Sequence, residues 1–595
     1  MKLTGFLFAA ALLGSCTQPA AEENYTRHVD PKIGTGGHGH VFVGANVPFG
    51  LVQVGPTSIP QTWDWCSGYH ASDSTVIGFS HTHLSGTGIG DLFDVTVMPV
   101  TGDVTYARGE EADPASGLWS YADRTQEIAR PGYYSVPLTR YGIRAELTAT
   151  ARVGLHRYTF PASDAAAVVF DLENGGCWDK ATETHLAKEG DRTVTGWRHS
   201  TGWAKDQRVY FAAEFSKPFE KFETIGDNYA RASFRTTDGE QVSLKVALSP
   251  VSIEGAKANL AAELPGWDFD ATAAADKAWN DELSKVKIET ADETARRIFY
   301  TALYHTMIAP SLFCDVNGDY RGADGKVHEN LGRDTYTTFS LWDTYRAAMP
   351  LMTVLHPERM PDIIQTMLHI ADEQGRLPVW HLWGNETDCM VGNPGIVAVA
   401  DAIVKGIGGF DREKAFEAIR KTAMNPDRGN GLRMEYGYIP CEMFNEAVAY
   451  DMEYALADGA AARAAETLGK AEDAKYFEER SHSYRNYFDP ATRFMRGRDS
   501  RKGWRTPFNA FASTHRADDY CEGNAWQYTW LAPHDVKGLE GLFGSRAKMI
   551  EKLDSLFTVS SVIEGGETSP DISGLIGQYA HGNEPSHHIL YLYTM

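Results

Sequence analysis

The sequence has few cysteines, no excess of basic residues and no apolar run long enough to cross a membrane. Its seven cysteines are widely spread and none forms a C-x-x-C pair, which argues against a disulfide framework and a structural zinc site. Lysine and arginine total 56 against 79 acidic residues, and the net charge of −23 argues against a nucleic-acid partner. No segment reaches the ~20 apolar residues of a transmembrane helix. At 595 residues, two or more globular domains are expected.

The N-terminus has the features of an export signal. Lys2 precedes the apolar run Leu3–Leu13, which is followed by small residues and Cys16. This ending resembles a bacterial lipobox, in which Cys16 would be lipidated and Thr17–Asn24 would form a polar tether. The alternative is an ordinary signal peptide that contains a cysteine. We therefore expect a periplasmic or cell-surface protein that contacts the outer membrane only through its lipid anchor.

The first half of the chain has the period of β-strands. Polar and apolar residues alternate in Ile143–Thr150 and again in Val242–Leu248. Alternation of this kind buries one face of a sheet, and many such runs separated by turn residues indicate an antiparallel β-sandwich. We expect this domain to span residues 25–267, after the signal and tether in 1–24.

After Pro265-Gly266 the period becomes helical. Paired helices of 10–20 residues joined by loops rich in Gly, Asn, Trp and His indicate a helical barrel. We expect linker helices in 268–290 and an (α/α)6 barrel in 291–595. The predicted helices are 273–286, 292–307, 343–355, 358–372, 395–407, 412–421, 444–468, 472–487, 520–531, 543–556 and 584–594.

Three motif matches do not have the context that their usual function requires. Gly34–Gly39 matches G-x-G-x-x-G, but no helix follows it, so we expect a glycine-rich loop near a pocket rather than a nucleotide site. Asp315–Asp319 resembles an EF-hand start, but Tyr320 occupies the glycine position, which indicates a polar turn. The H-x-H pair His81 and His83 has zinc-ligand spacing without a clear third ligand, so a structural or pocket-lining role is preferred.

The segment Cys521–Tyr528 carries the strongest catalytic signal. Glu522 lies among large aromatic residues, beside which a carboxylic acid can stay protonated near neutral pH. The amides of Asn524 and Gln527 are suited to bind sugar hydroxyls. We therefore predict that Glu522 is the general acid of a glycosidase, which normally needs a second carboxylate.

Two other segments have a similar composition. In Phe339–Arg346, Trp342 offers a stacking surface and Asp343 a hydroxyl acceptor, although Asp343 could instead cap a helix. The loop Gly375–Thr387 holds Trp380, Asn385 and Glu386, a set that favours substrate binding.

A third segment, Gly577–His588, contains an acidic residue directly before a proline. Glu584 could cap a helix that begins at Pro585, or bind a hydroxyl or a hard cation through oxygen.

Taken together, these motifs resemble the exo-acting α-mannosidases of glycoside hydrolase family 92. The resemblance spans residues 28–593 and is carried, in order, by GTGG…NVPFG…GP, GFSHTHLSGTG, SLWDTYRAAMP, LPVWHLWGNET, CEGNAWQYTW and GQYAHGNEPSHH. It implies a β-sandwich, linker helices and an (α/α)6 barrel, with the site between them. It also implies calcium-assisted removal of terminal α-mannose from glycans such as N-glycans, with inversion. The residues that it assigns are the acid Glu522, the mannose contacts Trp342, Asp343 and His587, and the calcium contacts Asn583, Glu584 and His588.

The sequence departs from the family pattern at its end. The family's general base lies in a later motif resembling G-N-D-D-x-G-x-M-S, and no such motif occurs before Met595. We therefore expect the base beyond residue 595, an incomplete barrel, and little or no activity from this chain alone. Two rivals remain: a surface lipoprotein that binds glycans without cleaving them, and another (α/α)6 enzyme such as a phosphorylase or lyase. Linkage preference, disulfide pairing and oligomeric state are not predicted.

Overall fold

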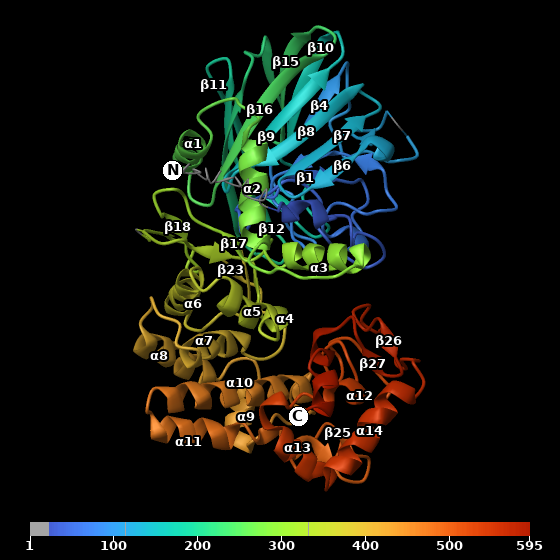
Figure 1. The fold of residues 1–595 in the computed structure, drawn as a ribbon, viewed down its shortest axis with the longest axis vertical. Helices are drawn as coiled ribbons and strands as arrows, with labels where there is room; N and C mark the ends of the chain where they lie inside the picture. The colour runs from blue at the N-terminus through green and yellow to red at the C-terminus, as the bar shows by residue number, and fades with distance from the viewer. Residues whose placement is uncertain (1–22, 114, 331) are drawn as a thin grey trace, which may run out of the picture.

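The computed structural model describes residues 23–113, 115–330 and 332–595, and the predicted signal and the lipidation site Cys16 lie outside them. A strand-rich N-terminal domain lies above a helical C-terminal domain in Figure 1, which confirms the predicted fold class. Within the described ranges, no helix is both long and apolar enough to pass through a bilayer.

Two large sheets form the N-terminal domain, and their neighbouring strands pair antiparallel. The six-stranded sheet runs in the order β1 (Gly55–Thr57), β3 (Gly78–Ser80), β4 (Thr96–Thr101), β10 (Ser163–Asp171), β15 (Tyr229–Thr236) and β14 (Lys221–Ile225). The eight-stranded sheet runs β11 (Lys180–Glu189), β12 (Thr193–Thr201), β13 (Gln207–Phe215), β16 (Glu240–Ser249), β9 (Val153–Phe160), β8 (Ile143–Ala149), β7 (Tyr133–Leu138) and β6 (Ile128–Arg130). A small pair, β2 (Thr75–Val76) and β5 (Ser120–Tyr121), lies beside them.

The alternating patterns expected to form strands correspond to β8 and β16. In β8, Ile143, Ala145 and Leu147 are buried, whereas Arg144 and Glu146 are partly exposed. One face of the strand therefore meets the core, as the period of two predicts.

Three helices connect the two domains: α1 (Ile253–Glu263), α2 (Ala271–Leu283) and α3 (Glu293–His305). The sequence pattern did not predict α1, which packs on β13 and β16. In α2, Trp279 is fully buried and its indole Nε1 donates to the carbonyl of Asn46 at 2.8 Å. This bond anchors the connecting helices to the strand-rich domain.

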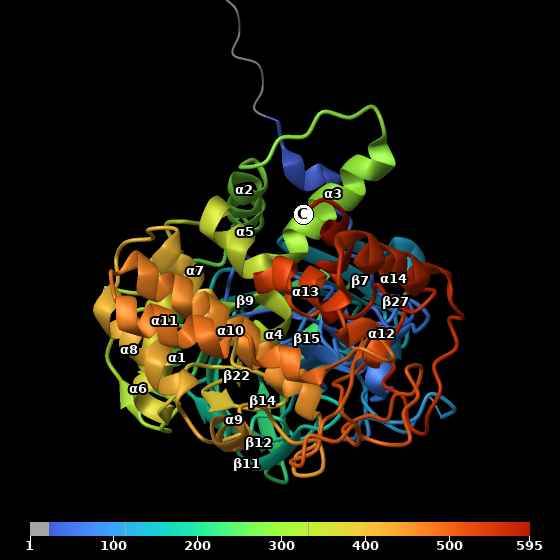
Figure 2. The same ribbon diagram turned by 90° about the horizontal axis from the view of Figure 1, so that it is seen from below.

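The C-terminal domain consists mainly of helices, consistent with an (α/α)6 barrel. Its helices are α4 (Leu341–Thr344), α5 (Ala348–Leu355), α6 (Met360–Gln374), α7 (Pro394–Val404), α8 (Arg412–Ala423), α9 (Asn430–Tyr436), α10 (Ala447–Thr467), α11 (Ala471–Arg480), α12 (Ala525–Tyr528), α13 (Val536–Phe543) and α14 (Arg546–Thr558). Seen from below, α6–α8, α10 and α11 lie on one side, and α12 and α14 lie on the other (Figure 2).

Short strands and 3-10 helices join these elements. The strands are β17 (Ser311–Leu312), β18 (Tyr320–Arg321), β19 (Val327–His328), β20 (Tyr336–Thr337), β21 (Phe339–Ser340), β22 (Trp380–Leu382), β23 (Asn385–Glu386), β24 (Phe488–Asp489), β25 (Phe494–Met495), β26 (Leu575–Ile576) and β27 (Tyr579–Ala580). The 3-10 helices are η1 (Tyr25–His28), η2 (Trp63–Trp65), η3 (Arg124–Gln126), η4 (Ser483–Tyr487), η5 (Pro533–Asp535), η6 (Glu584–Ser586) and η7 (Ile589–Tyr593).

Four predicted helices were wrong in extent or type. The segment 472–487 is helical only as far as Arg480, where α11 ends, and η4 follows it. The segment 343–355 is divided into α4 and α5, because Ala347 leaves the helical region with φ −144°. The segment 520–531 contains only α12, because Glu522 has φ 48° and Asn524 caps the helix after it. The segment 584–594 forms η6 and η7. The short helices α9 and α13 were not predicted, since each offers about two turns of periodic pattern.

A buried ion network holds the β10–β11 connection against the eight-stranded sheet. Arg198 on β12 is fully buried and donates to Asp94 at 2.7 Å, to Asp179 and to the carbonyl of Leu172 at 2.9 Å. Gln207 donates to the other oxygen of Asp94 at 2.6 Å. Two buried carboxylates and one backbone carbonyl therefore share a single guanidinium.

We predict that Arg198→Ala lowers the free energy of unfolding by about 3 kcal/mol, because it leaves two buried carboxylates without their cation. Thermal and urea melts check this. The matched control is Arg208→Ala, which removes a partly exposed pair with Asp206 and should cost under about 1 kcal/mol. Equal losses for the two variants would contradict the structural role of Arg198.

Candidate active site

A cavity of about 660 Å³ lies between the two domains, lined by loops from both. The strand-rich domain contributes histidines, tryptophans and a glycine-rich loop, and the helical domain contributes most of the acidic groups. The lining residues are His38–His40, Trp63, Gly86–Ile89, Trp178, Trp203, Asp343, Trp380, Cys389, Met390, His515, Arg516, Glu522, Ser569–Asp571, Ser573, Gly582 and Glu584.

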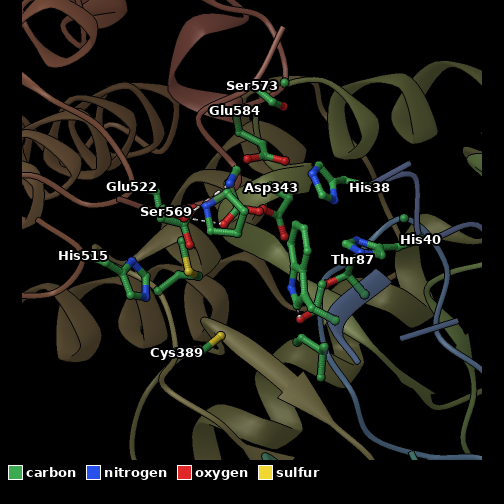
Figure 3. Close-up of a pocket in the computed structure, with 18 of the residues that line it drawn as sticks. His38, His40, Thr87, Asp343, Cys389, His515, Glu522, Ser569, Ser573 and Glu584 are labelled. Carbon is green, nitrogen blue, oxygen red and sulfur yellow. Dashed lines mark hydrogen bonds between the residues drawn. The ribbon is translucent and has the colours of Figure 1, made fainter. Parts of the chain in front are cut away.

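Four carboxyl groups face this cavity: Asp343, Glu522, Asp571 and Glu584. Figure 3 shows the side chains of Asp343, Glu522 and Glu584 around one space, with His38 and His40 on the side away from His515. Burial raises the pKa of Glu522 well above its ordinary value, and the charges of Asp571, Glu584 and Asp343 raise it further. A carboxyl group in this setting keeps its proton to higher pH than an exposed glutamate and can therefore act as a proton donor.

The backbone around Glu522 is held in a conformation that a non-glycine residue seldom adopts. Its φ of 48° lies in the left-handed region, which carries a conformational cost. The carbonyl of Glu522 accepts a hydrogen bond from Asn583 Nδ2 at 2.7 Å. This bond joins the acid-bearing loop to the segment that carries Glu584.

Asn524 and Gln527, predicted as hydroxyl-binding amides, hydrogen-bond to protein groups. Asn524 caps α12 and forms a capping box with Gln527. Asn524 Nδ2 also donates to Gln578 Oε1 at 2.9 Å, and Gln527 Nε2 donates to the carbonyl of Gln578 at 3.1 Å. Neither lines the cavity. Both amides therefore hold the Glu522 loop against the segment around Gln578.

Asp343 lies in α4, and interaction with the side chain of Trp380 acts to lower the pKa of its carboxyl group. Burial raises the pKa of Asp343 well above its ordinary value, the charge of Glu584 adds to this, and Arg346 partly opposes it. The loop bearing Trp380 is held by Glu386, whose carboxylate accepts from the backbone N–H of Val379 at 2.8 Å and of Trp380 at 2.9 Å. Glu386 therefore acts on the site through Trp380.

Other predicted binding residues lie outside the cavity lining. Trp342 is 1% exposed, with the Arg346 guanidinium 4.7 Å from its ring centroid. Asn385 pairs with the backbone N–H and carbonyl of Asp206 at 3.0 and 3.1 Å, which joins the two domains. His587 and His588 line a second cavity of about 800 Å³, where His588 Nε2 bonds the Trp530 carbonyl at 2.7 Å.

The acidic wall has the donor chemistry of a hard-cation site. The side chain of Glu584 faces the cavity, and Asn583 Oδ1 accepts from the Glu584 N–H at 3.1 Å. Burial raises the pKa of Glu584, and the charge of Asp571 raises it further. Carboxylate and amide oxygens are the ligands that calcium prefers, and a divalent cation would relieve the repulsion among these groups.

A second acidic group, formed by Glu282, His356 and Glu358, has ligand atoms within 4.8 Å of one another. The ammonium group of Lys285 already lies among them, 2.7 Å from Glu282, 2.8 Å from Glu358 and 3.2 Å from His356 Nδ1. These contacts make the group an ion-pair cluster next to the connecting helices.

Sequence reasoning missed several lining residues. Asp571 accepts a hydrogen bond from Ser569 Oγ at 2.6 Å and lies just before the motif that contains Glu584. A single aspartate in a turn has no distinctive pattern, so only its proximity to that motif could have indicated it. Trp178 and Trp203 were likewise missed, because each is an isolated aromatic residue in a loop.

The two histidine-containing motifs of the strand-rich domain lie in different places, one at the cavity and one in the buried interior. His38 and His40, in and after the glycine-rich loop, line the cavity, in keeping with the expected pocket-side loop. His81 and His83 are buried, with their Nδ1 atoms 2.6 Å from the Val95 carbonyl and 2.8 Å from the Gln53 carbonyl. These bonds support the structural role that was preferred for the H-x-H pair.

Comparisons with known proteins agree over nearly the whole chain. The glycosyl hydrolase family 92 N-terminal domain matches residues 28–249, and the catalytic domain of that family matches residues 255–595. A family GH92 α-mannosidase from Bacteroides thetaiotaomicron, solved in complex with mannoimidazole, has a TM-score of 0.92 and 38% identity and covers 96% of this chain and 78% of its own. A GH92 inverting mannosidase from the same organism has a TM-score of 0.84 and 30% identity, covering 96% and 80%. An uncharacterized secreted glycosidase from Arthroderma benhamiae is 26% identical over 95% of this chain and 78% of that protein.

The raised pKa of Glu522 predicts a pH-dependent gain in stability for Glu522→Gln. Between the unfolded and folded pKa values the native state binds more protons, so the free energy of unfolding of the wild type falls as pH rises. The amide escapes this loss, which is about 1.4 kcal/mol for each unit by which the pKa is raised.

Thermal melts at pH 7 and pH 4 check this prediction. The variant should melt above the wild type at pH 7, and the difference should close at pH 4. The exposed Glu479→Gln is the matched control and should change neither melt. A difference of the same size at both pH values would refute a charge-based origin.

Proposed function

Because this chain belongs to glycosyl hydrolase family 92, we propose that it is a calcium-dependent α-mannosidase that removes terminal mannose from glycans such as N-glycans, with inversion. Similarity to two solved GH92 mannosidases, one of them named as inverting, supports this proposal. The single observation that carries it is the placement of Glu522 in the interdomain cavity, with a pKa raised by burial and by three neighbouring carboxyl groups.

Glu522 is the proposed general acid. It gives its proton to the oxygen of the scissile bond, which lets the sugar leave as a neutral alcohol. Loss of this proton leaves a carboxylate beside Asp571, Glu584 and Asp343, and the resulting repulsion favours reprotonation after each turnover. Inversion also needs a carboxylate about 6.5–9.5 Å from the acid to take a proton from the attacking water. We assign that base to no residue of this sequence.

The acidic wall is the proposed site for mannose hydroxyls and calcium. Asp343 would accept hydroxyl hydrogen bonds, and Trp380, which lines the same cavity, would offer its ring to the sugar. Asn583 and Glu584 would hold the cation, whereas His588, which the family resemblance also assigned to calcium, lines the second cavity and is not part of this proposed site. When bound, calcium would neutralise the carboxylate charge and polarise sugar hydroxyls.

Export and lipid anchoring at Cys16 remain part of the proposal. The name of the fungal relative, a secreted glycosidase, supports export. The rival function is glycan binding without cleavage, for which an acidic and aromatic cavity would also serve. A proton-donating Glu522 distinguishes the two, because simple binding needs no carboxylic acid with a raised pKa.

Because no residue of this sequence is assigned as the base, we predict that the chain releases mannose only slowly from α-linked mannobioses in the presence of calcium, and that a chelator reduces this rate at least tenfold. Product analysis by NMR should show β-mannose first, because inversion changes the anomer. Azide is added in parallel, since it is a nucleophile that needs no general base, and its product would be β-mannosyl azide. Mannobiose binding with no cleavage in either condition would favour the rival binding function.

Glu522→Gln separates acid catalysis from substrate binding. We predict a loss of 10²–10⁴-fold in kcat on mannobiose, whose leaving group needs a proton, and little loss on 2,4-dinitrophenyl α-mannoside, whose leaving group does not. Wild-type activity on mannobiose should also fall as pH rises through the raised pKa of Glu522.

The matched control is Glu373→Gln. Glu373 on α6 is another partly buried glutamate with a raised pKa, but it lies outside the cavity lining. It should leave the ratio of the two substrates unchanged. Equal losses of Glu522→Gln on both substrates would refute the assignment of the acid.

A further inference from the structure

The strand-rich wall of the cavity carries a stacked tryptophan pair that the proposed chemistry does not use. Trp178 lies in the β10–β11 connection and Trp203 in the β12–β13 connection. Their ring centroids are 5.7 Å apart and their planes differ by 17°. Both residues line the cavity that contains Glu522.

The two loops are anchored by their backbones to one segment. The carboxylate of Asp91 accepts from the backbone N–H of Trp203 at 3.1 Å and of Ala204 at 2.9 Å. The N–H of Trp178 donates to the carbonyl of Gly90 at 2.8 Å. Neighbouring residues therefore hold both tryptophans, and the Arg198 network fixes Asp179 directly after Trp178.

The ring of Trp178 is not needed to fill the core. It is 40% exposed, although a tryptophan is among the side chains that gain most from burial. Large exposed apolar surfaces in a cavity mark binding sites more often than packing sites. The stacked pair thus offers a flat, preorganised apolar face to a ligand in the cavity.

The chemistry of this face selects a neutral sugar ring. The C–H face of a pyranose packs against a flat aromatic surface, whereas its hydroxyls need polar partners such as the carboxyl groups of the same cavity. The four carboxyl groups all lie on segments of the helical domain. The mannose being cleaved must meet this acidic wall, which leaves the tryptophan wall to the rest of the glycan.

We propose that Trp178 and Trp203 form a platform for a sugar residue of the leaving glycan beyond the one directly attached to the cleaved mannose. This inference rests on the proposed function and extends it, because it makes the protein prefer oligosaccharides over disaccharides. Trp178 supplies the surface that contacts the sugar, and Trp203 stacks on the ring of Trp178 and holds it in place.

The test compares ligand length and uses binding as well as turnover. Affinities of the wild type and of Trp178→Ala for α-mannobiose, α-mannotriose and a branched mannopentaose are measured by calorimetry in calcium, and KM is measured for each. The wild type should bind the longer glycans about tenfold more tightly than mannobiose, as expected for one stacking contact of about 1.4 kcal/mol. Trp178→Ala should remove this gain and leave mannobiose binding and kcat unchanged.

Two controls separate the platform from a folding role. Trp197→Ala removes a tryptophan of the same domain that stacks on His185 outside the cavity lining, and it should keep the preference for length. Trp203→Ala should reduce the preference less than Trp178→Ala. Thermal melts should show Trp178→Ala folded as the wild type.

The outcomes are distinguishable. A wild type that binds all three glycans equally, or a Trp178→Ala variant that keeps the length preference, overturns the platform and leaves the mannosidase proposal intact. Absence of both binding and cleavage of every mannoside by the wild type overturns the proposed function, and the platform with it.

Discussion

Four partly buried carboxyl groups share one cavity between the domains, and the surrounding structure has to stabilise them there. Each buried charge costs several kcal/mol unless it is paired, and neighbouring carboxyl groups add to the effect of burial in raising the pKa of Asp343, Glu522 and Glu584. A carboxyl group in such a place keeps its proton or acquires a cation. The same repulsion that destabilises the fold therefore makes Glu522 suitable to donate a proton and the acidic wall suitable to hold a hard cation.

The carboxyl groups stay together only because the surrounding structure holds the segments that carry them. The strained backbone of Glu522 is held by the amide of Asn583, and the capping box of Asn524 and Gln527 ties the same loop to Gln578. These amides contact protein rather than ligand, yet they determine where the acid lies. A substitution that removes one of these amides would displace the carboxyl group of Glu522 without changing Glu522 itself.

The two domains contribute different kinds of residue to the two walls of the cavity. The helical domain supplies the charged groups, and the strand-rich domain supplies flat aromatic and small residues on loops anchored to a rigid sheet. The buried guanidinium of Arg198 and the carboxylate of Asp91 stabilise those loops through hydrogen bonds. Contacts between the two domains, such as that of Asn385 with Asp206, hold the two walls of the cavity together. A site between domains can thus combine charge chemistry with recognition of a neutral ligand.

From the sequence we could predict the strand-rich and helical halves, most of the long helices and an acid in an aromatic segment, because periodicity and local composition are properties of neighbouring residues. It also indicated Asp343, Trp380 and Glu584, all of which line the cavity. It did not distinguish the amides of Asn524, Gln527 and Asn385, which bond protein groups, from amides that would bind sugar, because both roles use the same side chains. Only the tertiary structure brought in Asp571, Trp178 and Trp203 and placed Trp342 in the core. Those roles depend on which distant segments meet, and neither spacing nor composition encodes that directly.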